Sequence, residues 1–317
     1  MGDKYFKIGG MGLEYRIVQK EKQRKNRKAF YWLIGLCLFF AFFNVVLIEQ
    51  LVFQGTVRRL PSYAEETERF REMWMSEEAI LDLKEFQENY DVPLEEVLAV
   101  WMGVSEFRLD RFAAMPDSVR EIEYFQDSKE WYLERQEEAY QKLVEAYRAV
   151  ISDILYFPVP KSSNRKAADI YYSNGWGSER VYKDASHVHE GCDIMAGNNE
   201  RGYFPIVSMT DGVVERIGWL EKGGYRIGIR SPSGGYFYYA HLYRYAKDWK
   251  EGDSVKAGEL IGFMGDSGYS KVEGTVGNFA VHLHLGIYIQ TEHYVEQSVN
   301  PYWILRYFEE KRLGWEY

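Results

Sequence analysis

The sequence predicts a mainly β domain that is preceded by a membrane-spanning helix and an α-helical module. An uncharged apolar run occupies residues 29–48. The next stretch is poor in glycine, with Gly103 alone between Leu60 and Phe157, whereas 21 glycines lie from Gly175 to the C-terminus. The glycine-rich part carries short runs of β-branched and aromatic residues separated by turn residues, which is typical of antiparallel strands.

The apolar run is interpreted as an uncleaved transmembrane signal anchor. At about 1.5 Å per residue it spans about 30 Å, the thickness of the hydrocarbon core of a bilayer. Residues 1–28 carry nine Lys or Arg against three Asp or Glu. This basic segment predicts a cytoplasmic N-terminus, with the remainder of the chain outside the cytoplasm. A cleaved signal peptide is disfavoured because the run is long and no small-x-small cleavage site follows it.

Charge and cysteine content exclude other classes of protein. The net charge is −9, and residues 29–317 carry 30 basic against 45 acidic residues, a net of −15. An acidic body argues against nucleic-acid binding, because a phosphate backbone attracts a cationic surface. Of the two cysteines, Cys37 lies in the apolar run and Cys192 lies in the body. A disulfide-stapled secreted fold is therefore disfavoured.

Residues 49–157 are predicted to form a helical module. Pro93 begins and Gly103 ends a segment with apolar residues at helical intervals, and a second such pattern runs through 140–154. We expect this module to raise the next domain above the membrane and to offer a surface for a membrane or wall protein partner. Two prolines, at 158 and 160, mark the start of the β domain, residues 158–317.

Within the β domain, four strands are placed first. They cover 213–217, 225–230, 235–240 and 282–289, and a hairpin turn is expected over 231–235.

Three short patterns in this domain hold four of the six histidines of the chain. They are His-Glu-Gly-Cys-Asp at 189–193, Tyr-Ala-His-Leu at 239–242 and His-Leu-His at 282–284. Alternate residues of a strand share a face, so His282 and His284 are expected to point into one cleft. The same parity would place His189 beside Asp193 if their segment is extended, with Glu190 and Cys192 turned away. Two histidines and one aspartate, with a position left for water, are typical of catalytic zinc.

With these motifs, the chain resembles the LytM/lysostaphin-type zinc endopeptidases, which cut peptide bonds in peptidoglycan. The similar region runs over 176–305 and includes HEGCDI at 189–194, PIVSMTDGVV at 205–214, YAHL at 239–242, EGDSVKAG at 251–258, IGFMG at 261–265 and HLH at 282–284. The resemblance implies an antiparallel LytM-like fold and one Zn²⁺ per chain. It implies that His189, Asp193 and His284 bind the metal and that His241 and His282 are catalytic residues that do not bind it.

The two catalytic histidines would share the proton transfers of hydrolysis. Zinc lowers the pKa of a bound water, and an imidazole can accept or donate a proton near neutral pH. His282 is favoured as the base and His241 as the donor to the oxyanion, although the sequence also allows the reverse. The segment 266–281, which is longer than in most of the family, is expected to wall the substrate groove. His187 is interpreted as a loop residue and His293 as a solvated turn residue.

The predicted function is a membrane-anchored zinc endopeptidase that hydrolyses peptidoglycan peptides outside the cytoplasm. A catalytically silent scaffold or activator of another wall hydrolase is the alternative, because some members of the family keep the fold without activity. Those members usually lack metal or catalytic residues, whereas all five positions are filled here. A module that binds zinc without turnover is a third interpretation.

Overall fold

The computed structural model describes residues 9–164, 166–182 and 185–317, so residues 1–8 of the predicted basic N-terminus lie outside the described residues. The chain divides into two compact units, Met1–Val57 and Arg58–Tyr317.

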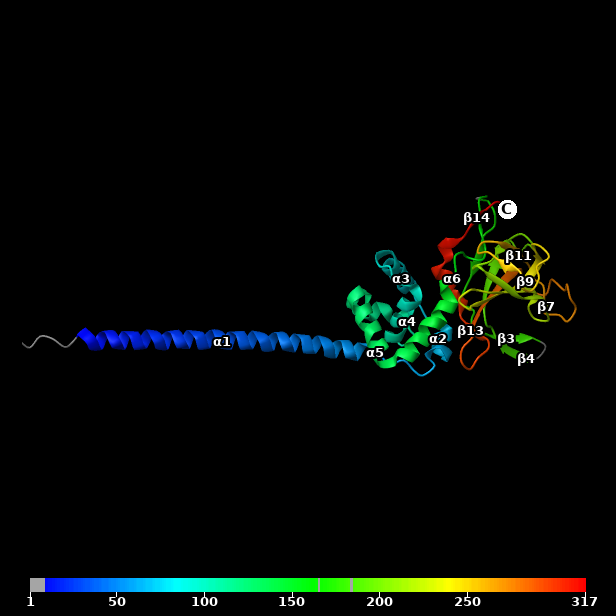
Figure 1. The fold of residues 1–317 in the computed structure, drawn as a ribbon. Coiled ribbons are helices and arrows are strands. Elements are labelled where there is room, and N and C mark those ends of the chain that lie inside the picture. The colour runs from blue at the N-terminus through cyan, green and yellow to red at the C-terminus, as the bar shows by residue number, and fades with distance from the viewer. Residues whose placement is uncertain (1–8, 165, 183–184) are drawn as a thin grey trace, which may run out of the picture. The chain divides into compact units, whose positions relative to one another are not determined.

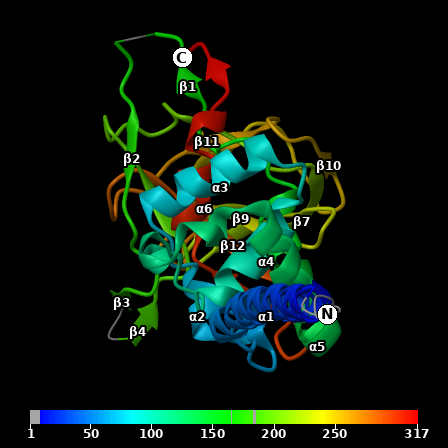
Figure 2. The same ribbon diagram turned by 90° about the vertical axis from the view of Figure 1, so that its left-hand side faces the viewer.

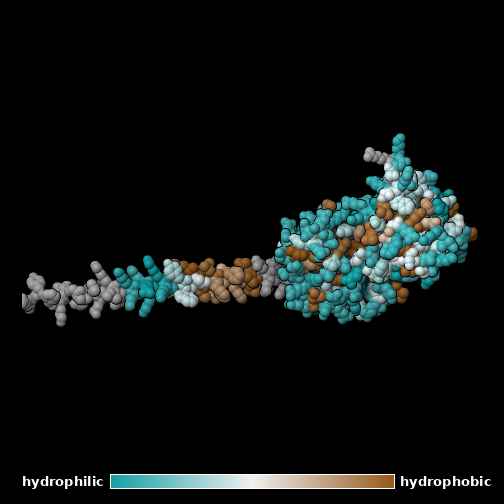
Figure 3. Space-filling view, turned by 45° about the horizontal axis from the view of Figure 1, so that its top comes forward, coloured by the Kyte–Doolittle hydropathy of each residue, from teal (hydrophilic) through white to brown (hydrophobic). Residues whose placement is uncertain are grey.

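The first unit contains one long helix, α1 (Gly9–Thr56), which includes the predicted anchor. Its segment Gln19–Leu47 is long and apolar enough to cross a membrane, although a signal sequence near an N-terminus meets the same criterion. The apolar part forms a hydrophobic band beside a hydrophilic one (Figure 3). Within this band the amide of Asn44 donates a hydrogen bond to the carbonyl of Phe40, at 2.7 Å. This bond lowers the cost of placing an amide in lipid. The orientation across a membrane stays a prediction.

The second unit begins with a group of helices that share one apolar core. They are α2 (Glu68–Glu72), α3 (Glu77–Asn89), α4 (Leu94–Val104) and α5 (Ile122–Tyr147), and a π-helical turn over Arg148–Ser152 continues α5. The predicted helix between Pro93 and Gly103 corresponds to α4, with Pro93 at its N-cap. Trp101 is fully buried and packs against Phe112 and Phe86. The predicted helical character of this region is confirmed.

The rest of the second unit is built on a ten-stranded antiparallel sheet, in the order β10-β7-β8-β9-β12-β5-β2, with β11 paired to β6 and β9 and with β13 paired to β12. Its strands are β2 (Ile170–Tyr172), β5 (Cys192–Ala196), β6 (Pro205–Val207), β7 (Gly212–Leu220), β8 (Gly224–Arg230), β9 (Tyr236–Tyr245), β10 (Ser254–Val255), β11 (Leu260–Met264), β12 (His282–Ile289) and β13 (Gln297–Val299). The predicted β domain and its four strands are confirmed.

Two small pairs of strands and one helix complete this part. Strand β1 (Lys161–Ser162) lies parallel to β14 (Gly314–Trp315), β3 (Glu179–Tyr182) forms an antiparallel pair with β4 (Ala185–Val188), and helix α6 covers Pro301–Tyr307. The expected hairpin turn at 231–235 joins β8 to β9, where the amide of Ser231 donates to the carbonyl of Gly235.

Strand β12 separates the core of the sheet from its functional face. Leu283, Leu285 and Ile287 are fully buried in the core. Because successive side chains of a strand point to opposite faces, His282 and His284 lie on the other face.

The helices pack against the sheet at β13. In Figure 1 the helices α3 to α5 gather on one side of this unit and the strands on the other, and Figure 2 views it from the helical side. The Arg71 side chain in α2 donates to the carbonyl and hydroxyl oxygens of Ser298, at 3.0 and 2.8 Å. The backbone amide of Asn300 donates to the backbone carbonyl of Arg71 at 2.7 Å. Helices and sheet therefore share an interface, while the domain boundary at residue 158 and the role of the helices as a spacer stay predictions.

Replacing Arg71 by alanine should weaken this interface. Two hydrogen bonds to Ser298 would be lost, and a charged hydrogen bond that leaves its partner buried is worth about 1–3 kcal/mol. We expect Arg71→Ala to lower the free energy of unfolding of residues 58–317 by this amount in urea denaturation. Arg216→Ala is the matched control, because the Arg216 side chain is 61% exposed and its ion pair among the described residues is a single long contact with Glu251, at 3.5 Å. Equal stability of the two variants would contradict the interface.

Candidate active site

Three neighbouring strands and the loop before β5 bring the five predicted site residues to one cleft. Asp193 lies in β5, His282 and His284 lie in β12, and His241 lies in β9. His189 lies in the loop before β5. The register pairs His284 with Asp193 on one side and with Ala240 of β9 on the other. The ladder of hydrogen bonds therefore fixes the spacing of these side chains.

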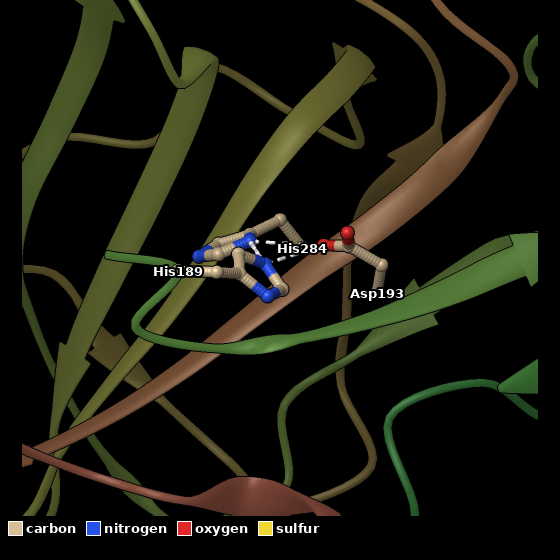
Figure 4. A group of neighbouring side chains, drawn as sticks. All are labelled: His189, Asp193 and His284. Atoms are coloured by element: carbon tan, nitrogen blue, oxygen red, sulfur yellow. Dashed lines mark hydrogen bonds and ion pairs between the residues drawn. The ribbon is translucent and has the colours of Figure 1, made fainter. Parts of the chain in front are cut away.

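His189, Asp193 and His284 form a compact group of potential metal ligands. Nε2 of His189, Oδ1 of Asp193 and Nδ1 of His284 are each 3.0 Å from the other two. The two imidazoles and the carboxylate converge on one point in Figure 4. Bonds of about 2.0–2.1 Å at tetrahedral angles would place neighbouring zinc ligands about 3.3 Å apart. The donor atoms and their spacing thus fit a zinc ion with a fourth position open.

Surrounding groups orient these ligands. Nδ1 of His189 donates to the carbonyl of Gly175 at 2.9 Å, which leaves Nε2 unprotonated in the neutral ring. Arg180 in β3 donates to Oδ2 of Asp193 at 3.1 Å and leaves Oδ1 facing the histidines. Gly191 passes beneath His284, where an added Cβ would lie 2.5 Å from Cε1 and 2.7 Å from the carbonyl of Leu285. Glycine is therefore required there to make room for the His284 ring.

Asp193 stays ionised in this setting. Burial alone would raise the pKa of its carboxyl, but hydrogen bonds with His189 and His284 outweigh that effect and hold the pKa well below its usual range. A carboxylate is the form that binds a divalent metal.

His241 and His282 present the same ring nitrogen to the cleft. Nδ1 of His241 donates to the carbonyl of Ser267 at 2.8 Å, and Nδ1 of His282 donates to the carbonyl of Ala280 at 2.7 Å. Nε2 of each ring is therefore the free acceptor in the neutral form, and Nε2 of His282 lies 3.7 Å from Oδ1 of Asp193.

An irregularity of the backbone orients the His241 side chain. Its φ of 61° lies in the left-handed region, which an L-residue adopts only when the surroundings hold it there. The register between β8 and β9 also shifts beside it, as in a β-bulge. The bulge directs the His241 ring to the cleft.

Both histidines are kept neutral near pH 7. Burial, reinforced by His282 and His284, lowers the pKa of His241 well below its usual range. Burial also lowers the pKa of His282, although the nearby Asp193 opposes this shift. Neutral imidazoles are available to accept a proton.

The cleft has a volume of about 1130 Å³ and is walled by the β3–β4 hairpin and by the segment 266–281. From the latter, Phe279 places its ring 4.6 Å from that of His241 and 5.1 Å from that of His282, and Tyr269 stacks on His241. Asp266, which is 2% exposed, forms an ion pair with Arg201 and fixes the start of this segment. The expected wall of the groove is present.

Some residues lie differently from what the sequence indicated. His187 belongs to strand β4 and lines the cleft, instead of lying in a loop. Glu190 is not turned away from the site, because strand β5 begins only at residue 192; it lines the rim and pairs with Arg71 at 3.7 Å. Cys192 is buried on the far face as expected. His293 is half exposed and pairs with Glu66 at 3.0 Å.

Comparison with known proteins identifies the fold family. Residues 187–301 match the family described as peptidase family M23. A crystal structure assigned as a glycyl-glycine endopeptidase LytM from Ruminococcus gnavus ATCC 29149 is 42% identical, with a TM-score of 0.70, and the match covers 82% of this chain and 97% of that one. The chain belongs to peptidase family M23. M23 relatives are zinc metallopeptidases that hydrolyse peptidoglycan.

Curated relatives match shorter stretches of this chain. An L-Ala–D-Glu endopeptidase of Bacillus subtilis (strain 168) is 39% identical over 170 residues, which are 54% of this chain and 48% of that protein. Lysostaphin of Staphylococcus simulans is 37% identical over 99 residues, which are 31% of this chain and 17% of that protein. The chain therefore spans about half the length of the Bacillus relative and less of lysostaphin.

Gly191→Ala should impair metal binding without removing a ligand. The new methyl group would displace His284 or the backbone at Leu285, and disturbed support of a ligand typically lowers metal affinity about 10- to 100-fold. Competitive zinc titration measures this loss. Gly314→Ala is the control, because a Cβ at Gly314 meets no atom within 4 Å. Unchanged zinc affinity in Gly191→Ala would contradict the role of His284 as a ligand.

Proposed function

We propose that this M23 protein is a membrane-anchored zinc endopeptidase that hydrolyses peptide bonds in peptidoglycan. The observation that carries the proposal is the joint geometry of the cleft. Three potential ligand atoms lie 3.0 Å apart, and two further histidines present free Nε2 atoms to the same space. A structural zinc site would need a fourth protein ligand, whereas a catalytic site keeps one position open.

His189, Asp193 and His284 would hold the zinc. When bound there, the ion would supply a Lewis acid that polarises the scissile carbonyl and makes water acidic enough to attack near neutral pH. Hydrolysis adds water across the C–N bond, so the site must remove a proton from water and deliver one to the departing amine.

His282 is assigned as the base and His241 as the group that stabilises the oxyanion. The carboxylate of Asp193, 3.7 Å from Nε2 of His282, favours a positive charge on that ring after proton uptake. His241 lies deeper, with its ring 4.7 Å from that of His282. His282 can then pass the proton that it took from water to the departing amine. His241 can donate a hydrogen bond from Nε2 to the oxyanion once it takes up a proton, because the negative charge of the oxyanion offsets the burial that keeps the resting ring neutral.

The sequence and helix α1 support the proposed anchor. An apolar helical segment of bilayer length, with basic residues before it, supports a cytoplasmic N-terminus and an extracytoplasmic active site. The wall would then be within reach of the tethered enzyme.

The silent-scaffold alternative receives less support from the cleft. A silent scaffold has no need for two histidines that are shielded from water. His241 and His282 are nevertheless only 5% and 8% exposed, and the Nδ1 atom of each is hydrogen-bonded. Two neutral, oriented imidazoles beside the ligand group therefore support a role in proton transfer over a silent scaffold.

Two substitutions separate metal binding from catalysis. We expect His284→Ala to lose both zinc and peptidoglycan hydrolysis, because it removes a ligand. We expect His241→Ala to keep about one zinc per chain and to lose about 10²- to 10⁴-fold in rate, because only a proton-transfer group is removed. Zinc content of the full-length protein in detergent and mass spectrometry of the released muropeptides measure the two properties.

Removal of the metal with a chelator should abolish hydrolysis, and one equivalent of zinc should restore it. Full activity in His284→Ala would overturn the assignment of His284 as a ligand that hydrolysis requires. Zinc binding by the wild type with no hydrolysis of any peptidoglycan would favour the module that binds zinc without turnover.

The orientation of the anchor is tested by labelling introduced cysteines in intact spheroplasts. An impermeant maleimide should label Ser163→Cys, which lies in the second unit, and should not label Gln23→Cys, which lies before the apolar run. The native Cys192 is buried and serves as the internal background. The opposite pattern would reverse the topology, and release of the protein into the medium would indicate a cleaved signal.

A further inference from the structure

Arg226 is a cation of the cleft that the chemistry above does not use. It lies in β8, lines the cleft and is half-buried. Its Nε and Nη1 atoms have almost no contact with solvent and no hydrogen-bond partner among the described residues. Buried N–H groups are nearly always paired, and an unpaired buried charge is especially costly. The charge of the Arg226 guanidinium is therefore uncompensated by the described residues, and an anion that reaches the guanidinium from the cleft would offset it.

The other cations of the cleft are neutralised or hydrated. Arg180 pairs with Asp193 at 3.1 Å, and the exposed Arg216 pairs with Glu251 at 3.5 Å. Lys222 is exposed to water. No carboxylate of the described residues is recorded within 4.0 Å of the Arg226 guanidinium, so its charge remains available to an anion.

The register places Arg226 in line with the potential metal ligands. Tyr225 pairs with Leu242 and Ile227 with Tyr239, so Arg226 lies opposite the bulge at His241. The same row continues through β9 to His284 in β12. Strands are about 4.8 Å apart, so the backbones of Arg226 and His284 are about 10 Å apart. Both side chains line the same cleft, so a bound substrate that spans this distance can contact both.

An aromatic floor lies around Arg226. The rings of Tyr236 and Tyr238 lie over glycines, since a Cβ at Gly228 would be 1.9 Å from the Tyr236 hydroxyl and one at Gly223 would be 2.2 Å from the Tyr238 hydroxyl. The ring of Tyr238 is 6.0 Å from that of His284. This floor excludes water from one side of the guanidinium, which strengthens its attraction for an anion.

We propose that Arg226 binds the free carboxylate of an acidic substrate residue next to the scissile bond. A glutamyl residue has two carboxyl groups, and only one of them joins the next residue. A stem peptide cleaved at the amine of such a residue therefore carries a carboxylate within a side-chain length of the reacting carbonyl. Arginine matches a carboxylate with paired hydrogen bonds. A polyglycine bridge has no such group, so Arg226 selects acidic stem peptides over glycine bridges.

This inference rests on the proposed function for the position of the scissile bond. The test uses full-length zinc-loaded protein and two stem peptides that differ at one group, L-Ala–γ-D-Glu–L-Lys with a free α-carboxylate and its α-amide. A charged hydrogen bond is worth about a 10- to 100-fold effect. We expect kcat/KM to favour the carboxylate peptide by this factor, mainly through KM, and pentaglycine to be a poor substrate.

Variants of Arg226 should remove this preference selectively. Arg226→Gln should lose the 10- to 100-fold preference and cleave the amide peptide as the wild type does, and Arg226→Lys should retain part of it. Arg216→Gln, in the same cleft, should leave the ratio unchanged. A merely structural role would instead lower activity on both peptides equally.

The outcomes distinguish the two proposals. Equal cleavage of both peptides by the wild type, or preferred cleavage of pentaglycine, would overturn the role of Arg226 while the peptidase stands. Should neither these peptides nor peptidoglycan be cleaved, the hydrolase proposal fails. The Kd of each stem peptide for zinc-loaded His241→Ala, measured by calorimetry, then decides the role of Arg226. Tighter binding of the carboxylate peptide supports it, and equal Kd values overturn it.

Discussion

The register of strand β12 between β5 and β9 is the constraint on which the site depends. His284 pairs with Asp193 on one side and with Ala240 on the other. A slip of one residue would bring Leu283 and Leu285 to the cleft and turn both histidines into the core. Burial of those leucines opposes the slip, so the same hydrophobic face that stabilises the sheet also holds the ligand atoms 3.0 Å apart.

The helices contribute to the site through its least regular part. His189 precedes β5, and its backbone is held by two hydrogen bonds outside the main sheet: its amide donates to the carbonyl of Ser178, and its carbonyl accepts from the amide of Gly177, both at 2.9 Å. Its neighbour Glu190 pairs with Arg71 of α2 and accepts a hydrogen bond from Ser298 of β13. The helices therefore support the loop that carries a potential ligand, in addition to any part they play in spacing the domain from a membrane.

Residue parity predicted much of the site, because a strand has a strict period of two. The spacing of His282 and His284 was enough to place both on one face, and the joint occurrence of the motifs placed His189 and Asp193 beside them. Parity failed at Glu190, since the chain before β5 is irregular and follows contacts with distant residues. The positive φ of His241 could also not be predicted from the sequence, because a bulge depends on the pairing with the partner strand. The roles of these residues as ligands and proton carriers remain predictions.

Arg226 shows why a sequence alone underdetermines a cleft. It alternates with Gly228 in the predicted strand 225–230, which indicates that the two share a face but not which face bears the site. Only the order of β8 beside β9 brings Arg226 into line with His284. Whether the Arg226 guanidinium has a hydrogen-bond partner depends on all the residues that surround it in the fold. A local sequence pattern therefore cannot predict it.

The central claim is that His189, Asp193 and His284 hold one catalytic zinc. Anomalous diffraction from crystals of the purified protein, recorded on both sides of the zinc absorption edge, tests it most directly. The account predicts one strong zinc peak per chain, within about 2.0–2.2 Å of Nε2 of His189, a carboxylate oxygen of Asp193 and Nδ1 of His284, with solvent in the remaining position. A zinc peak elsewhere, or a fourth protein ligand closing the site, would contradict it.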